Sequence, residues 1–222
     1  MTTTAPTSGT LSAPRGTSTK GAPPQMLSHL AYVTPDAEAT VDFYTRVMGM
    51  EFVLAVMDDK VPSTGEDFPY FHIFFRLGDG STIAFFEAPG LPARPKPTHP
   101  AYDVFDHLAL QVDTPAEVEA WAEKLKGMGI DVLGPVDHKI IYSVYFHDPV
   151  NDLRLEITTP LRPDWNDQGP AAQAALADWS EAKRRAAQSG DDPTEELLAT
   201  IRSRAKHVAD AQAEADADGT PI

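Results

Sequence analysis

Two stretches of the chain carry the same features in the same order, and this repeat constrains the fold more than any other feature. The shared features are His-Leu-Ala, Thr-Pro and a glycine, at residues 29–31, 34–35 and 49 and again at 107–109, 114–115 and 129. A repeat of this length indicates a duplicated supersecondary unit. His29 and His107 stand at matching places in a predicted strand, so face-to-face pairing of the copies would let them converge on a metal.

Composition narrows the class of protein. At 42% hydrophobic residues the chain can bury a core, and the absence of cysteine excludes disulfides, thiolate ligands and cysteine nucleophiles. The net charge of −15 disfavours nucleic acid and anionic lipid as partners. No apolar run reaches the length of a membrane span, and residues 1–25 read as a disordered leader without a signal-peptide core. We therefore expect a cytoplasmic enzyme with no membrane partner.

The first copy has the pattern of a β-α-β-β-β unit. Thr34 is the expected N-cap of a helix that begins at Pro35 and ends at Gly49. Alternating or apolar runs predict strands at residues 28–33, 51–57, 70–77 and 81–88, with a polar loop over 58–69.

The second copy repeats that order after a proline-rich linker at residues 89–103. Thr114 and Glu117 form a predicted capping box for a helix that runs to about residue 126. Strands are expected at residues 105–112, 130–136, 139–147 and 153–158. Two helices are expected at 170–188 and 193–212. The predicted domains are 26–160, with modules at 27–90 and 104–160, and a helical extension at 161–222.

Carboxylates that could complete a metal site lie in the last strand of each copy. Glu156 stands among apolar residues in the second copy, where a buried carboxylate is costly unless it is paired or bound to metal. Glu87 is the analogous candidate for a fourth ligand in the first copy. Counted from the preceding turn, however, Ala84 or Phe85 could match Glu156 instead of Glu87. Open sites of two histidines and one carboxylate favour non-haem Fe(II).

Tyr145 lies one strand before Glu156 and is the candidate catalytic residue. A tyrosine beside a metal can donate a hydrogen bond to a substrate oxygen. The remaining histidines are expected at the surface or in hydrogen bonds, with His72 the hardest of them to dismiss because aromatic residues flank it.

The chain resembles the vicinal oxygen chelate superfamily, which includes glyoxalase I, extradiol dioxygenases and bleomycin-resistance proteins. The residues that carry the resemblance are 27–33, 41–44, 48–50, 105–112, 146–149 and 153–156. The resemblance implies an α+β fold in which two βαβββ modules form a cup-shaped mixed sheet around one metal. It implies His29, His107 and Glu156 as ligands, and a fourth ligand near Phe85 or Glu87 only in the glyoxalase pattern.

Tyr145 favours the extradiol pattern, because it precedes the turn proline as the active-site tyrosine of that group does. A second-sphere histidine that the pattern places near residues 81–83 is missing here. The leading hypothesis is thus a non-haem Fe(II) dioxygenase that cleaves or oxidises a small aromatic diol, or a similar chelating substrate, with O₂. The alternatives are a glyoxalase-type lyase or isomerase that uses Ni²⁺, Zn²⁺ or Mn²⁺, and a non-enzymatic small-molecule binding or resistance protein. A homodimer is the candidate assembly.

Overall fold

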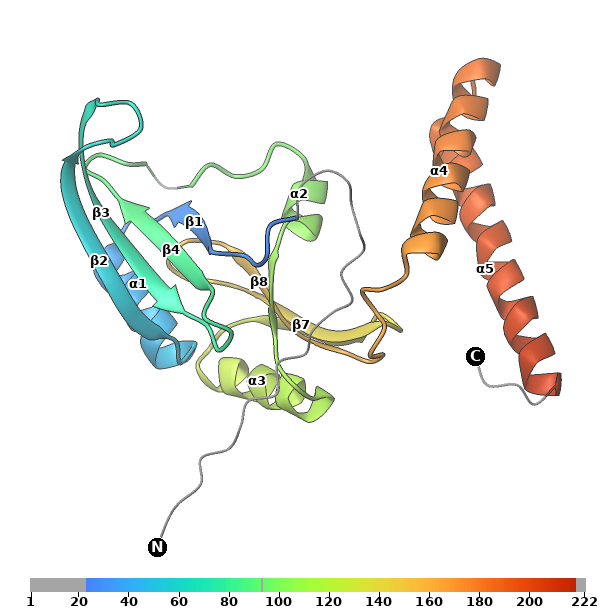
Figure 1. Ribbon diagram of the computed structural model, residues 1–222, viewed down its shortest axis with the longest axis horizontal. Coiled ribbons are helices and arrows are strands. Elements are labelled where there is room, and N and C mark those ends of the chain that lie inside the picture. Colours follow the sequence, from blue (N-terminus) through green and yellow to red (C-terminus); the bar gives the residue numbers. More distant parts are fainter. Residues whose placement is uncertain (1–22, 93, 219–222) are drawn as a thin grey trace, which may run out of the picture.

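Two four-stranded mixed sheets and a C-terminal helical hairpin make up the computed structural model, which describes residues 23–92 and 94–218 (Figure 1). The strand orders are β1-β4-β3-β2 and β5-β8-β7-β6, so each predicted module forms its own sheet with the same topology. The α+β fold class that the family resemblance implied is therefore confirmed. Residues 1–22 of the expected leader lie outside the described residues.

The first sheet pairs β1 with β4 in parallel, and its other neighbours are antiparallel. A short helix, α1, continues into a π-helical turn, η1, and both follow β1 in the chain. The elements of this module are β1 His29–Val33, α1 Ala37–Asp42, η1 Phe43–Val47, β2 Glu51–Lys60, β3 Asp67–Arg76 and β4 Thr82–Glu87.

The second sheet repeats this pairing, with β5 parallel to β8. The elements that follow β4 in the chain are α2 Pro100–Phe105, β5 Leu108–Gln111, α3 Pro115–Gly127, β6 Val132–Asp137, β7 Ile141–His147, β8 Arg154–Pro160, α4 Gly169–Ser189 and α5 Pro193–Asp218. The capping box of Thr114 and Glu117 at the start of α3 is present as predicted. Helices α4 and α5 also occur where the sequence indicated them.

Four local expectations were wrong. The polar loop at residues 58–69 is mostly a hairpin, because β2 and β3 extend until Lys60 pairs with Asp67. Backbone pairing at a solvent-exposed hairpin needs no apolar side chains, so polarity alone misled the prediction. Asp36, not Thr34, caps α1, since its side chain accepts a hydrogen bond from the amide of Ala39.

The predicted strand at 105–112 is shorter than expected, and the linker before it is not irregular throughout. Residues 100–105 form α2, which begins at Pro100 with the His99 side chain as its cap. Proline is well suited to the first helical position, so this proline marks a helix start within the linker. Phe105 consequently belongs to a helix, and β5 begins only at Leu108.

The core lies on the helix-covered faces of both sheets and forms one continuous cluster. Tyr44 is its centre in the first module, with its ring 5.2 Å from Phe75 and 4.9 Å from Phe85 between ring centres. In the second module, Val118 and Leu125 of α3 are fully buried. The hydroxyl of Tyr44 donates to the Asp148 carboxylate, 3.1 Å away, and so joins the two modules.

The opposite face of each sheet is not covered by a helix of its own module. Exposed apolar side chains gather on that face of the first sheet, among them Val33 and Leu54, each about half exposed. The α4–α5 hairpin stands apart from both sheets (Figure 1). No helix in the described part of the chain has the length and apolar character needed to cross a membrane.

Candidate metal centre

His107 and Glu156 meet on the uncovered face of the second sheet. Ala109 pairs with Glu156 across the parallel β5–β8 ladder. Because side chains alternate along a strand, His107 lies on the same face as Ala109 and Glu156. The Nε2 atom of His107 lies 2.7 Å from Oε2 of Glu156, and its Nδ1 atom lies 2.9 Å from the carbonyl oxygen of Phe105. Two predicted ligands are therefore in direct contact.

The Glu156 carboxylate has the properties of a metal ligand. It is only 1% exposed, and its Oε1 atom is buried without a hydrogen-bond partner. Leaving an ionised oxygen buried and unpaired is costly, and a bound cation removes that cost. The environment of Glu156 thus fits a divalent metal held by its carboxylate and the His107 imidazole.

Tyr145 borders this pair. It is the direct cross-strand partner of Glu156, and its ring meets that of His107 edge to face, with centres 5.6 Å apart. Burial raises the pKa of the Tyr145 hydroxyl, and the neighbouring Glu156 charge raises it further, so this hydroxyl keeps its proton at neutral pH. Tyr145 can therefore act as a hydrogen-bond donor.

His138 is a site residue that the sequence did not reveal. Its Nε2 atom lies 2.9 Å from the Tyr145 hydroxyl. His138 belongs to the turn between β6 and β7, where Lys139 adopts a positive φ of 71°. The turn folds back so that its histidine reaches a tyrosine further along the same hairpin, and the sequence pattern carries no signal for this contact.

His29 lies on the other sheet and forms no ion pair with a carboxylate among the described residues. Its ring centre is 6.0 Å from that of Phe74, on the uncovered face of the first sheet. His72 shares that face, stacks on Phe86 with ring centres 3.5 Å apart, and has a buried Nε2 atom without a partner. Burial, reinforced by His29, lowers the pKa of His72. Among residues 23–92 and 94–218, no three metal-binding side chains are grouped around one point.

The strand register resolves which residue of the first module matches Glu156. The alanine of the repeated His-Leu-Ala motif pairs with Ala84 in the first sheet and with Glu156 in the second. Ala84 therefore occupies the carboxylate position and offers no ligand atom. Glu87 is three residues further and faces the opposite side of the sheet. There its Oε2 atom accepts a hydrogen bond of 2.6 Å from the amide of Ala37, at the start of α1.

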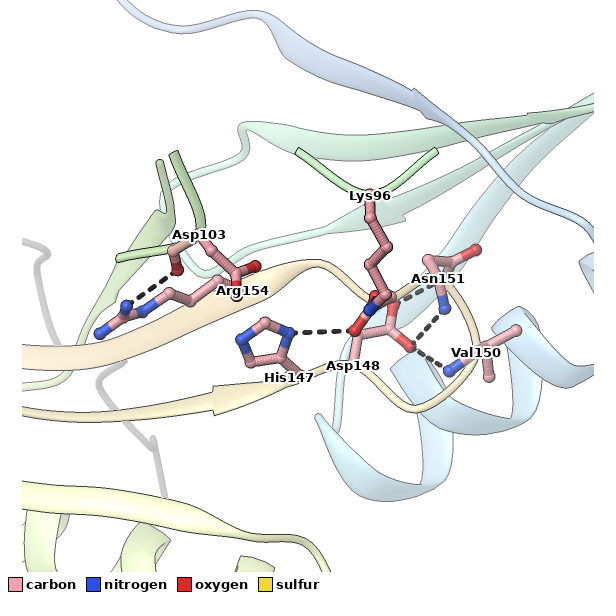
Figure 2. Close-up of polar contacts among 8 residues, drawn as sticks. Lys96, Asp103, His147, Asp148, Val150, Asn151 and Arg154 are labelled. Atoms are coloured by element: carbon pink, nitrogen blue, oxygen red, sulfur yellow. Dashed lines mark hydrogen bonds and ion pairs between the residues drawn. The ribbon is translucent and has the colours of Figure 1, made fainter. Parts of the chain in front are cut away.

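A cavity of about 450 Å³ opens beside His107. The linker and α2 form one wall, and the start of β8 forms the other. Figure 2 shows the charged residues on the β8 side, where Arg154 donates to the backbone carbonyl of Asp103 and His147 turns toward the β7–β8 turn. The volume suits a small organic molecule.

Comparisons with known proteins agree with this architecture. The profile of the Glyoxalase/Bleomycin resistance protein/Dioxygenase superfamily matches residues 26–160. A glyoxylase/bleomycin resistance protein/dioxygenase domain from Frankia sp. EAN1pec superposes with a TM-score of 0.51 at 17% identity, covering 62% of this chain and 99% of that one.

Two further solved structures are similar. Lactoylglutathione lyase from Agrobacterium tumefaciens has a TM-score of 0.43 at 25% identity, covering 62% of this chain and 95% of its own. The fosfomycin resistance protein FosX from Listeria monocytogenes, complexed with Mn(II) and sulfate, has a TM-score of 0.43 at 21% identity, covering 61% and 92%. No curated protein sequence matches the chain.

Proposed function

Because the chain belongs to the glyoxalase/bleomycin resistance protein/dioxygenase superfamily, we propose that it is a metal-dependent dioxygenase with a non-haem Fe(II) centre. Its substrate would be a small aromatic diol, or a similar molecule that chelates metal through two oxygens, and O₂ would be the second substrate. His29, His107 and Glu156 would hold the metal. Mn, Ni and Zn remain the other metals that such nitrogen and oxygen ligands can bind.

The observation that carries this proposal is the buried Glu156 carboxylate, with one oxygen on His107 and the other without a partner. A site of two histidines and one carboxylate leaves open positions for substrate and O₂. The glyoxalase-type alternative uses a fourth protein ligand. Ala84 at the matching register position, and Glu87 engaged with Ala37, argue against such a ligand.

When bound, Fe(II) would supply the coordination of the diol and the electrons that activate O₂. The side chains around it would orient the substrate and move protons. The Tyr145 hydroxyl, which keeps its proton, would donate a hydrogen bond to a negatively charged substrate oxygen. His138 would hold that hydroxyl in place by donating from its Nε2 atom to the hydroxyl oxygen across their 2.9 Å contact. This pair would take the place of the second-sphere histidine that the first module lacks.

The proposal is tested by anaerobic loading of the purified full chain with Fe(II), followed by measurement of iron content and of O₂ uptake with catechol. We expect stable iron binding and diol-dependent O₂ uptake, and loss of both in H107A, because that variant removes a ligand. E87Q is the matched control and should keep both. Iron binding that persists in H107A, or a wild-type protein that binds no Fe(II), would contradict the proposal.

We also propose that a homodimer completes the metal site. Within one chain His107 and Glu156 meet, whereas His29 lies on the uncovered face of the first sheet. That face exposes Val33, Leu54 and Val56, with exposed fractions of 50%, 51% and 38%. A second copy of the chain packed against this face would bury these apolar side chains. A two-fold axis would then give each site His29 from one protomer and His107 with Glu156 from its partner.

Subunit mixing distinguishes this assembly from a site within one chain. H29A and E156Q should each lack metal-dependent activity. After the two variants are unfolded together and refolded, about a quarter of all sites should be intact, because each mixed dimer contains one site with no substituted ligand. O₂ uptake and bound iron would return to about that fraction of the wild-type level. No recovery, despite mixed dimers detected by mass spectrometry, would contradict the shared site.

A further inference from the structure

The structure assigns a second recognition element to the cavity beside His107. We infer that Arg94 and Arg154 bind a carboxylate group of the substrate there. The inference deepens the proposed function, on which it rests for the diol end of the substrate. It names the substrate class as a singly charged, carboxylate-bearing aromatic diol.

Most arginines of this acidic chain are paired with carboxylates. Six arginines of the described residues form ion pairs with carboxylates: Arg46, Arg76, Arg162, Arg184, Arg185 and Arg204. Arg94 and Arg154 form none within residues 23–92 and 94–218, although acidic residues outnumber basic ones by 33 to 18 in the chain. Both line the same cavity. Arg202, also without an ion pair among these residues, lies far along the chain on α5.

Arg154 is held in position by its neighbours on β7 and α2. This residue is two positions before Glu156 on β8, so its side chain leaves the same face of the sheet. The guanidinium carbon lies 4.7 Å from the centre of the Tyr145 ring, and one terminal nitrogen donates to the Asp103 carbonyl at 3.0 Å (Figure 2). A guanidinium has five N–H donors, so others are left to bind a ligand. Arg154 therefore connects the metal-binding face to the cavity.

Arg94 supplies a second cation from the linker. Its guanidinium carbon lies 5.6 Å above the ring of Tyr32, and no side-chain hydrogen bond holds it among the described residues. Tyr32, Tyr102 and Phe105 add aromatic surface to the same cavity. An aromatic acid matches this lining, because its ring can pack on these side chains while its carboxylate meets a planar guanidinium fork.

The acidic residues of the cavity limit the charge of the ligand. Asp152 is already neutralised by an ion pair with Lys96 and by a contact of 3.1 Å with His147. Asp103 and Asp106 also line the cavity and would repel a multiply charged anion such as a phosphate ester. A ligand with a single carboxylate is therefore the best match for a cavity that both arginines line. The volume of about 450 Å³ suits a single-ring compound.

The test compares protocatechuate, a dihydroxybenzoate, with catechol as substrate of the Fe(II)-loaded full-length protein. We expect a higher kcat/KM for protocatechuate in the wild type. R154Q and R94Q should lower that value about 10- to 100-fold through KM, because each removes a charge-assisted hydrogen bond. The same variants should lower kcat/KM for catechol by a smaller factor than for protocatechuate, since catechol has no carboxylate for these arginines to bind. R202Q is the matched control and should behave as wild type with both substrates.

A second measurement separates this inference from the proposed function. Calorimetric titration of the metal-free protein with benzoate requires neither iron nor turnover. Binding that weakens in R154Q and in R94Q supports the carboxylate site even if no diol gives O₂ uptake. The inference is overturned if benzoate binding is absent from the wild type, or is the same in wild type and both variants. Equal kcat/KM values for the two diols, unchanged by the substitutions, would overturn it while leaving the dioxygenase proposal standing.

Discussion

Replacing Glu156 with glutamine is expected to abolish metal binding and, at the same time, to stabilise the metal-free protein. The native carboxylate is 1% exposed and has one oxygen without a partner, so the apo protein bears the cost of a buried charge. Removing that charge should raise the free energy of unfolding by about 1–3 kcal/mol in the absence of metal. Activity with added Fe(II) should fall by at least about 100-fold, because even indirect contacts to metal ligands contribute 10- to 100-fold.

Thermal unfolding with and without added metal measures both effects. Wild type should gain stability with metal, since a ligand that binds only the folded state shifts the unfolding equilibrium. Without metal, E156Q should unfold at a higher temperature than wild type, and added metal should not raise that temperature further. E87Q is the matched carboxylate control. It loses a charged acceptor for the Ala37 amide, so it should unfold at a lower temperature than wild type without metal. Added metal should still raise its unfolding temperature as it does for wild type. A metal-induced gain of wild-type size in E156Q would refute Glu156 as a ligand.

Asp148→Ala is expected to have the largest effect on folding stability. Asp148 is fully buried in the β7–β8 turn (Figure 2). Its carboxylate accepts hydrogen bonds from Tyr44, from the Val150 amide at 2.7 Å, and from both the backbone and side-chain nitrogens of Asn151. Alanine would leave these donors buried without partners. We expect a loss of about 3–5 kcal/mol, a large part of the stability of a typical domain.

Urea unfolding of D148A and Y44F distinguishes the contribution of the turn to stability from that of the contact between the modules. Y44F removes only the contact across the modules and should cost about 1–2 kcal/mol. Were D148A to unfold at the same urea concentration as wild type, the carboxylate would not be a structural centre of the turn.

The same link predicts how stability depends on pH. Burial, with Asp148 beside it, raises the pKa of Tyr44 well above its ordinary value of 10.0. In the unfolded chain this hydroxyl loses its proton above that pH, whereas the folded protein retains it. The contribution of the Tyr44 hydroxyl to the free energy of unfolding is therefore complete below pH 10. It is lost as the pH rises toward the pKa that this hydroxyl has in the folded protein. In Y44F the free energy of unfolding should fall less steeply above pH 10 than in wild type. Urea titrations at successive alkaline pH values would measure this difference.

The architecture follows from the sequence alone, because the signals that encode it are local and occur twice. The repeated histidine, the Thr-Pro helix start and the glycine stop predicted two modules of one topology, and both sheets have it. The capping box of Thr114 and Glu117 was also readable, since its members are three residues apart. Glu156 stood out as a charge within an apolar strand for the same reason.

The chemistry available around those residues could not be read from the sequence, because it depends on strand register and on contacts between distant segments. A shift of one residue moves a side chain to the other face of a sheet. Counting along the chain therefore left Ala84, Phe85 and Glu87 as alternatives, and the β1–β4 pairing identified Ala84. The contact of His138 with Tyr145, and the arrangement that brings Arg94 of the linker and Arg154 of β8 to one cavity, likewise have no pattern in the sequence.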